Sequence, residues 1–255
     1  MPIAASLFYS LSARGVENKP SLVLIHGAGG NHLAWPPSLR RLPGWNVLAV
    51  DLPGHGRSAG LGQQSIQRYA NQLVNFLTGV DLYQVVLVGH SMGGAIALQV
   101  ALDQPSLVAG LGLISTGAYL GVPQAMLENV ADPLTLPQAL ALFQSLAFSP
   151  ETAPGLVEQS MRLLQEERSI VLAGDWLACA AFDLSERVAQ ISCPSWVAVG
   201  ADDRLTPLPY AHFLAASLPN ARLEVIPGAG HMVIVEKPAE VAQSLGEFLE
   251  GNFRF

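Results

Sequence analysis

Uninterrupted runs of apolar residues recur along the chain, and each run ends in a glycine or a polar turn. Strands that are buried on both faces carry such runs, because neither face needs polar side chains. The sequence therefore predicts six buried strands, within residues 20–27, 46–56, 84–91, 107–116, 194–203 and 221–231. An earlier segment, residues 6–13, alternates apolar and polar positions, which predicts a first strand with one face buried.

Between these runs the apolar residues recur with the spacing of a helix. This pattern covers residues 64–80, 93–104, 210–218 and 238–251. Strands and helices therefore alternate, which is typical of an α/β fold. We predict a mostly parallel, doubly wound sheet with helices on both faces.

One long segment, residues 118–186, breaks the alternation. It contains no convincing strand, and three helical patterns, at residues 136–148, 152–167 and 171–182, are separated by prolines. We predict a core formed by residues 1–117 and 187–255, with residues 118–186 inserted as a helical lid. A long insertion in a compact domain is usually functional.

A single serine lies at the end of the run 84–91, within the segment GHSMGG (residues 89–94). Gly89 and Gly93 lack a Cβ, so the strand and the following helix can pass close together behind Ser91. The helix N-terminus beyond it offers free N–H groups and a positive dipole end to a developing anion. The pattern G-x-S-x-G between a strand and a helix predicts that Ser91 is a nucleophile.

A serine hydroxyl needs a base, and the base needs an acid that orients it. His231 follows the last apolar run in a glycine-rich loop and is the candidate base. Asp202 and Asp203 both follow the strand predicted at residues 194–203, and we favour Asp203 as the acid. The chain order is then Ser, Asp, His, which is the order found in doubly wound hydrolases.

Five motifs in this order resemble those of the α/β-hydrolase superfamily: HGAGG (26–30), DLPGHGRS (51–58), GHSMGG (89–94), GADDRLTP (200–207) and GAGHMVIVEKP (228–238). In that family the acid is the Asp three residues after the Gly that ends its strand, which is Asp203 here. The resemblance implies an oxyanion hole made by the backbone N–H groups of Met92 and Ala28, with Gly29 as the alternative to Ala28. It also implies structural roles for His26 and for the DLPGHGRS turn.

By the same resemblance, residues 118–186 are the family's helical lid, which roofs the substrate pocket. Apolar side chains of the lid are candidates to line this pocket, together with Gly29: Phe143, Phe148, Met161, Trp176 and Phe182. The lid contains nine acidic residues against Arg162 and Arg168. An acidic carrier protein needs a basic docking surface, so we expect a small free ester as substrate and no carrier protein.

A serine nucleophile points to acyl transfer and hydrolysis, whereas dehalogenases and epoxide hydrolases of this fold use an aspartate. His90 precedes the serine, as in carboxylesterases, whereas the C–C bond hydrolases commonly have an asparagine there. A serine esterase acting on small, mainly apolar esters is therefore the first hypothesis, and it needs no cofactor and no metal. A cofactor-free perhydrolase (haloperoxidase) and a C–C bond hydrolase share the same triad. A small-molecule receptor on this fold is the alternative from another class.

Charge, cysteine content and the length of the apolar runs indicate which partners and which cellular location to expect. The 255 residues carry a formal net charge of -7, and the sequence pI is about 5.3. Binding to nucleic acid needs a basic face, so we expect none. The two cysteines show neither metal-ligand spacing nor a disulfide framework. No apolar run reaches the ~18 residues of a membrane span, and no signal peptide is apparent, so we expect a cytoplasmic protein without membrane contact.

Overall fold

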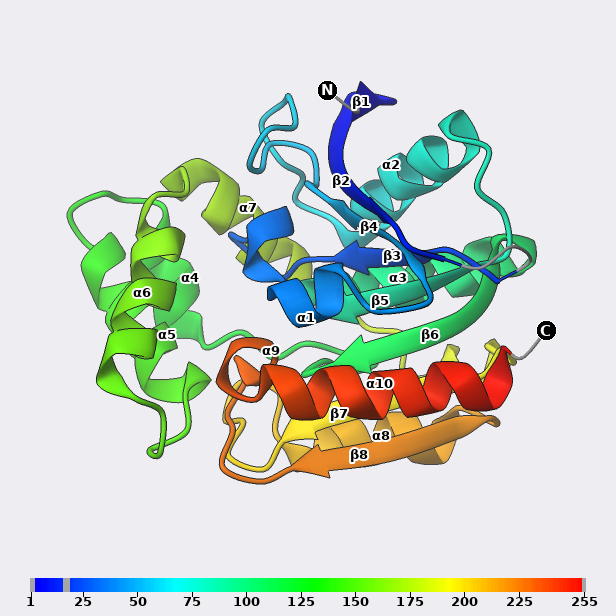
Figure 1. Ribbon diagram of the computed structural model, residues 1–255. Coiled ribbons are helices and arrows are strands. Elements are labelled where there is room, and N and C mark those ends of the chain that lie inside the picture. Colours follow the sequence, from blue (N-terminus) through cyan, green and yellow to red (C-terminus); the bar gives the residue numbers. More distant parts are fainter. Residues whose placement is uncertain (1–2, 16–18, 254–255) are drawn as a thin grey trace.

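Eight strands form a single sheet in the order β1-β2-β4-β3-β5-β6-β7-β8 (Figure 1). The computed structural model describes residues 3–15 and 19–253, so the ends of the predicted core (1–2 and 254–255) and residues 16–18 lie outside the described residues. β1 and β2 pair antiparallel, β2 pairs antiparallel with β4, and every other neighbouring pair is parallel. The strands are β1 (Ile3–Ala4), β2 (Leu7–Ala13), β3 (Leu22–Ile25), β4 (Asn46–Val50), β5 (Val85–His90), β6 (Val108–Ile114), β7 (Ser195–Gly200) and β8 (Ala221–Ile226).

The uninterrupted apolar runs form the centre of the sheet. Every residue of β3, β5 and β7 is buried, because helices cover both faces there. β8 differs from the prediction of a strand buried on both faces. Five of its six residues are exposed or half-buried, because β8 is the edge strand and carries Arg222 and Glu224.

Helices cover the two faces of the sheet with separate apolar cores. On one face, α2 (Ile66–Gly79), α3 (Met92–Asp103) and α8 (Leu208–Ser217) pack against the strands. On the other face lie α1 (Pro37–Arg40), α9 (Val233–Glu236) and α10 (Pro238–Asn252), the last of which runs along the front of Figure 1. This confirms the predicted α/β fold with a mostly parallel sheet.

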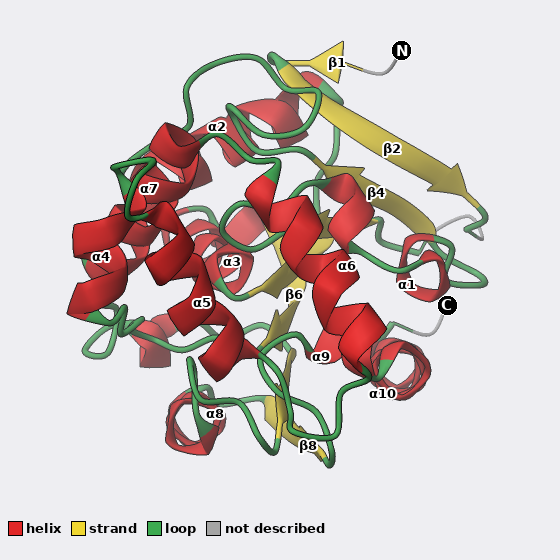
Figure 2. Cartoon of the chain, turned by 90° about the vertical axis from the view of Figure 1, so that its left-hand side faces the viewer, coloured by secondary structure: helices red, strands yellow, loops and turns green. Residues whose placement is uncertain are grey.

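Four α-helices between β6 and β7 gather at the carboxyl end of the sheet (Figure 2). They are α4 (Gln124–Val130), α5 (Leu136–Ala147), α6 (Pro154–Gln165) and α7 (Ser169–Ala180). The chain enters and leaves this insertion side by side, because Tyr119 forms an isolated bridge with Asp183 and the Leu184 N–H donates to the Ala118 carbonyl. Sequence periodicity missed α4, which has only seven residues.

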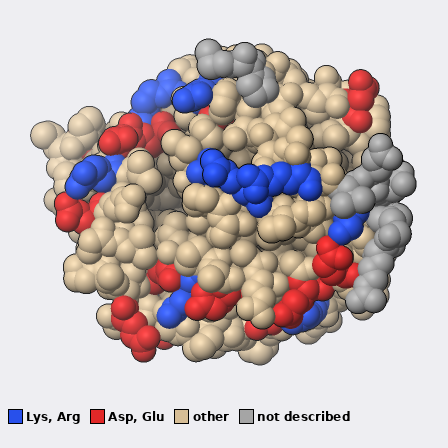
Figure 3. All heavy atoms as spheres, viewed as in Figure 1, with Lys and Arg blue, Asp and Glu red and all other residues tan. Residues whose placement is uncertain are grey.

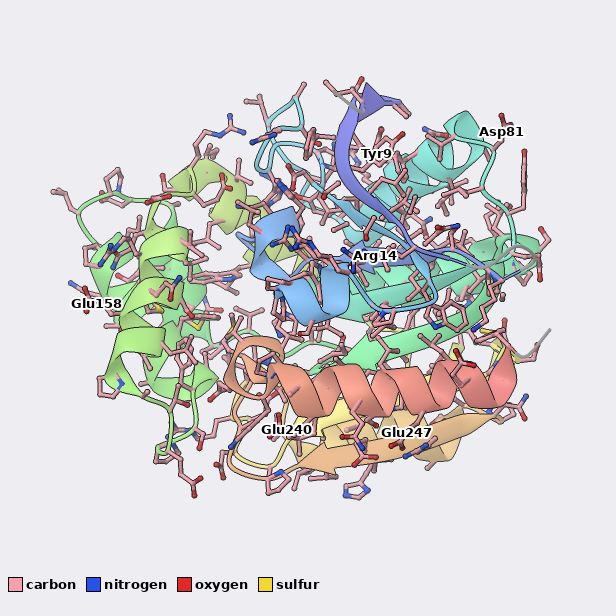
Figure 4. The ribbon with its side chains drawn as sticks, viewed as in Figure 1. Tyr9, Arg14, Asp81, Glu158, Glu240 and Glu247 are labelled. Carbon is pink, nitrogen blue, oxygen red and sulfur yellow. The ribbon has the colours of Figure 1, made fainter. Side chains whose placement is uncertain are left out.

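Charged side chains lie mostly at the outside of the molecule. Figure 3 shows a largely uncharged face with acidic groups around its edge and a short row of basic groups across its middle. Glu158 stands at the outer edge of the insertion in Figure 4, where it pairs with Arg162 in the next turn of α6. Among the described residues, no helix has both the length and the apolar character needed to cross a membrane.

Candidate active site

Ser91 occupies a sharp turn between β5 and α3. Its φ of 54° and ψ of -119° lie in a region that non-glycine residues rarely adopt, so the turn is strained. The turn also requires glycines on both sides. A Cβ on Gly89 would lie 2.2 Å from the Gly93 backbone, and a Cβ on Gly93 would lie 2.1 Å from the Ile25 carbonyl oxygen. The sequence thus folds into an elbow that holds the serine hydroxyl clear of the strand.

The Ser91 hydroxyl belongs to a chain of three hydrogen-bonded side chains from three separate segments. Its Oγ lies 3.0 Å from Nε2 of His231, on the loop after β8. Nδ1 of His231 lies 3.0 Å from Oδ2 of Asp203, on the loop after β7. With the Nδ1–H donating to the carboxylate, Nε2 accepts from the serine hydroxyl. The imidazole is therefore held in the tautomer that a general base at Ser91 requires.

Asp203 is held as an ionised acceptor by a tight turn. Its Oδ1 accepts hydrogen bonds from the Leu205 and Thr206 N–H groups, and its Oδ2 accepts one from the Thr206 hydroxyl at 2.8 Å. Burial alone raises the pKa of Asp203, but the bonds to His231 and Thr206 outweigh it and lower that pKa below the usual range. The carboxylate therefore keeps its negative charge beside the imidazole.

The neighbouring Asp202 has a different contact. Its Oδ2 accepts a hydrogen bond from the Ser149 hydroxyl at 2.6 Å, so it joins the β7 loop to the end of α5 in the insertion. No hydrogen bond links Asp202 to His231 in the described structure. Of the two candidate acids, the geometry brings Asp203 to the histidine.

Two further histidines near Ser91 have structural contacts. His90 is buried, its Nε2–H donates to the His231 carbonyl at 2.9 Å, and burial lowers its pKa to about 3. Nε2 of His26 accepts a hydrogen bond from the Leu52 N–H, and its Nδ1–H donates to the Gly27 carbonyl. His26 thereby joins the turn after β3 to the DLPGHGRS segment.

The turn after β3 provides the second wall beside Ser91. The Gly30 N–H donates to the Gly27 carbonyl at 3.1 Å, which closes a four-residue turn, and Gly29 has a φ of 64°. Within the described residues, nothing accepts a hydrogen bond from the Ala28 or Met92 N–H, so both remain available to an anion. The Gly29 N–H is already used, because it donates to Asp175 Oδ2 at 2.8 Å.

A cavity of about 230 Å³ opens above Ser91, between the insertion and the core. Ala28, Gly29, Ser91 and His231 line it on the core side. The insertion contributes aromatic and methionine side chains, which are Met126, Phe143, Phe148, Met161 and Trp176. No residue lining this cavity carries a carboxylate, ammonium or guanidinium group. The cavity is therefore suited to an uncharged, mainly apolar molecule.

Phe182 does not reach the cavity, and its assignment to the pocket is wrong. It lies beyond the end of α7 and is buried in the core cluster with Leu184 and Val188. Because α7 ends at Ala180, the helical spacing that directs Trp176 into the cavity does not extend to Phe182.

Two residues that were not predicted from the sequence hold the site together. Thr206 bonds Asp203 through both its N–H and its hydroxyl, and Asp175 holds the turn at Gly29. Thr206 could have been predicted, because a threonine three residues after an aspartate can form a turn that bonds the aspartate side chain. Asp175 could not, because its partner lies 146 residues away in the sequence. In the described ranges no group of three His, Cys, Asp or Glu side chains is placed to hold a metal ion.

A doubly wound sheet with a serine elbow, a histidine and an aspartate at strand ends is the arrangement of the α/β hydrolases. Residues 22–244 match the alpha/beta hydrolase family, and the chain belongs to it.

The similarity to known proteins covers nearly the whole chain. The putative carbamate hydrolase RutD of Pseudomonas syringae pv. syringae is 28% identical over 95% of this chain and 98% of its own. The structure of a thermophilic esterase is 32% identical with a TM-score of 0.81, covering 96% of this chain and 98% of that one. A hydrolase from Pseudomonas aeruginosa PA01 is 30% identical with a TM-score of 0.84, covering 95% and 94%. These likenesses make hydrolysis the common chemistry of the group.

Proposed function

We propose that this protein is a serine hydrolase that cleaves small, mainly apolar carboxylic esters through an acyl-enzyme. One observation carries the proposal: Ser91 and His231, which are bonded to each other and through His231 to Asp203, line a cavity whose described lining has no Asp, Glu, Lys or Arg side chain. Serine alone is a weak nucleophile, and this chain of contacts is the means by which a histidine activates it.

The reaction follows from these contacts. His231 Nε2 accepts the Ser91 proton as Oγ attacks the ester carbonyl, and Asp203 stabilises the imidazolium that forms. The Ala28 and Met92 N–H groups donate to the oxyanion of the tetrahedral intermediate. His231 then gives its proton to the leaving alcohol. Water, activated by the same imidazole, attacks the acyl-enzyme and releases the acid, which restores Ser91.

The cavity indicates which esters fit. Apolar residues form most of its lining, and Phe143 stacks near Trp176 with ring centroids 6.3 Å apart. Binding an anionic acid or alcohol group there would remove its hydration without an opposite charge to compensate, which costs several kcal/mol by order of magnitude. Neutral acyl chains are therefore the expected substrates. The excess of acidic over basic residues in segment 118–186 argues against an acidic carrier protein delivering the substrate.

Carbamates are a second candidate class, favoured by the likeness to the putative carbamate hydrolase RutD. A neutral carbamate presents the same carbonyl to Ser91 and needs the same oxyanion donors. Attack on it is intrinsically slower, because nitrogen donates electrons to the carbonyl. Turnover of a neutral aryl carbamate beside the aryl ester of equal size decides between the two classes.

The decisive experiment is hydrolysis of p-nitrophenyl esters, from acetate to octanoate, by the wild type, Ser91→Ala and Ser115→Ala. Ser115 is a matched control: it is also buried beyond the end of a central strand with a positive φ, and its hydroxyl has no hydrogen-bond partner among the described residues. We expect Ser91→Ala to lose at least about 10⁴-fold in kcat and Ser115→Ala to keep full activity.

The other outcomes separate the alternatives. Activity that survives in Ser91→Ala would overturn the assignment of the nucleophile. Faster reaction of the acyl-enzyme with hydrogen peroxide than with water would identify a perhydrolase. Cleavage of a carbon–carbon bond beside a ketone, without ester turnover, would identify a C–C bond hydrolase. Tight binding of a small molecule with negligible turnover would identify a receptor.

A further inference from the structure

A fully buried carboxylate, Asp175, lies on α7 beneath the oxyanion turn. It is one of the acidic residues counted in the lid by the sequence analysis, yet none of its surface is exposed. Its Oδ2 accepts hydrogen bonds from the Gly29 N–H and from His55 Nε2, both at 2.8 Å, and its Oδ1 accepts one from the Tyr69 hydroxyl. Burying a carboxylate is costly unless such donors surround it, so this placement needs a function.

The contact with Gly29 controls the conformation of the turn beside Ser91. A hydrogen bond from the Gly30 N–H to the Gly27 carbonyl closes a four-residue turn, of which Gly29 is the third residue. The positive φ of Gly29, together with a negative φ at Ala28, makes this a type II turn. Types I and II differ by a flip of the central peptide, here the one joining Ala28 to Gly29. In the observed form its N–H points at Asp175. A flip would direct the Ala28 carbonyl oxygen at the same carboxylate, and the two would repel.

The carboxylate is itself fixed in place by core residues. Nδ1–H of His55 donates to the Pro53 carbonyl while Nε2–H donates to Asp175, so both ring nitrogens act as donors and the ring is an imidazolium. Burial lowers the pKa of His55, but attraction and hydrogen bonding to Asp175 outweigh burial and raise it. The Tyr69 hydroxyl also accepts from the Gln63 N–H, which holds the phenol against Oδ1.

The rest of α7 and its neighbour α6 are packed onto the same place. Arg168, at the start of α7, donates to the Gly54 and Gly60 carbonyls of the loop that contains His55. A Cβ on Gly29 would lie 2.5 Å from Leu164 of α6 and 2.9 Å from Leu172 of α7. The insertion therefore touches the turn through both a charge-assisted hydrogen bond and close apolar contact.

The geometry points to Asp175 as a positioning residue of the reaction: from the insertion, it fixes the Ala28–Gly29 peptide and so holds the turn 27–30, which carries the Ala28 N–H, in its observed form. This inference rests on the proposed function for the chemistry at Ser91. Asp175 touches neither substrate nor nucleophile and acts only through the turn. Seating of α7 and completion of the oxyanion hole are thus one event.

The test compares three variants by kcat, KM and melting temperature with p-nitrophenyl butyrate. Asp175→Leu removes the acceptor and keeps the branching at Cγ. Asp175→Asn is the conservative variant, because its carbonyl can still accept from Gly29 and His55 while its amide faces Tyr69. Ser244→Ala is the structural control: it leaves the buried Trp196 indole N–H without its partner, far from the site.

We expect Asp175→Leu to lose about tenfold to hundredfold in kcat with KM changed less than about threefold, because a misplaced donor weakens only the transition state. Asp175→Asn should keep kcat within about threefold, and Ser244→Ala should lower the melting temperature with kcat intact. An Asp175→Leu variant with wild-type kcat would overturn the inference. So would a loss of kcat in Ser244→Ala of the same size, since that would show a merely structural effect.

A measurement without turnover covers the case in which Asp175→Leu folds poorly or the proposed function fails. Labelling with ¹³C′-alanine and ¹⁵N-glycine selects the Ala–Gly pairs, including Ala28–Gly29, and follows amide exchange at Gly29. The wild type and Asp175→Asn should protect this amide about tenfold more than Asp175→Leu. Equal exchange in all three would refute this role of Asp175. A protected amide in a protein that cleaves no ester would refute the proposed function alone.

Discussion

The two sides of Ser91 are held in different ways. On the acid–base side, the hydrogen-bond partners of His231 and Asp203 come from the core, through Thr206, Leu205 and His90. On the oxyanion side, the free N–H of Ala28 belongs to a turn whose next N–H is held by Asp175 of the insertion. In the proposed reaction, the direct partners of the proton-transfer pair thus belong to the core, whereas the turn that carries the oxyanion donor is held by α7.

This difference means that proton transfer by His231 and stabilisation of the oxyanion can be altered separately, although kcat reports both. A change in the core turn around Asp203 should alter the charge and orientation of His231. A change at the contact between α7 and Gly29 should leave the imidazole intact and weaken only the stabilisation of the oxyanion. A hydrolase of this design can therefore vary its insertion to change the pocket, provided that Asp175 and its partners remain.

The strongest test of the acid–base side is the pair Asp203→Asn and Asp202→Asn. Asp203→Asn offers an amide to His231 and stabilises the wrong tautomer, so kcat should fall by about 10³-fold or more. Asp202→Asn alters one hydrogen bond to Ser149, which is worth about 1 kcal/mol, so kcat should stay within about fivefold. Steady-state kinetics on one ester checks both.

Both variants replace a carboxylate with an amide, and the two positions are adjacent. The general effect on kcat of removing one negative charge is therefore the same in both and cancels in the comparison. Equal losses in both would show that the insertion contact at Asp202 matters as much as the contact with His231. That result would break the distinction drawn between the two sides.

The oxyanion side is tested by Gly29→Ala against Gly155→Ala. The new Cβ at residue 29 would meet Leu164 and Leu172 and would force a side chain into a positive φ. The turn must then move or α6 and α7 must lift, and we expect kcat/KM to fall about tenfold to hundredfold. Gly155 lies in α6 with open space around it, so alanine there should stabilise the helix by about 0.5–1 kcal/mol.

Thermal melts should accompany the kinetics, because a clash at Gly29 also lowers stability. If Gly29→Ala retained wild-type kcat/KM, the turn would have to tolerate displacement, and the role given to Asp175 would lose its basis.

The sequence allowed much of the core to be predicted because the determinants are local. The runs that form β3, β5 and β7 are apolar throughout, and the glycines of GHSMGG read directly as a tight elbow. Ser91, Asp203 and His231 each follow a predicted strand, and the parallel sheet brings such ends together. The exposed face of β8 was not foreseen, although Arg222 and Glu224, at alternate positions of the strand, were a signal of it.

The insertion was harder because its contacts are not local. Its helices were recognised, but which side chains face the cavity depends on where each helix is seated, so Phe182 was misassigned while Phe143 and Trp176 line it. Asp175 shows the limit most clearly. In the sequence it is one more acidic residue in an acidic segment, and only the fold brings it to Gly29, His55 and Tyr69.

The finest test returns to the acid–base side, through the hydroxyl of Thr206. Thr206→Val removes one donor to Asp203 and keeps the shape, so the pKa of Asp203 should rise towards its usual range. Because that pKa is lowered in the folded protein, Asp203 contributes stability above the unfolded value of 3.8, and this contribution is lost as pH falls through the folded value. In Thr206→Val this contribution should therefore be smaller, and its loss on acidification should be complete at a higher pH than in the wild type.

Melting temperatures between pH 3 and pH 7 measure this shift, with Thr206→Ser as the variant that keeps the hydroxyl. We expect kcat at neutral pH to fall only about threefold in Thr206→Val, since the backbone donors to Oδ1 remain. Asp175→Leu should leave this acid transition in place while lowering kcat more. The two variants could instead show the same pH profile and the same loss of kcat. The two sides of Ser91 would then act as a single cooperative unit, and it would make no difference to catalysis that one is held by the core and the other by the insertion.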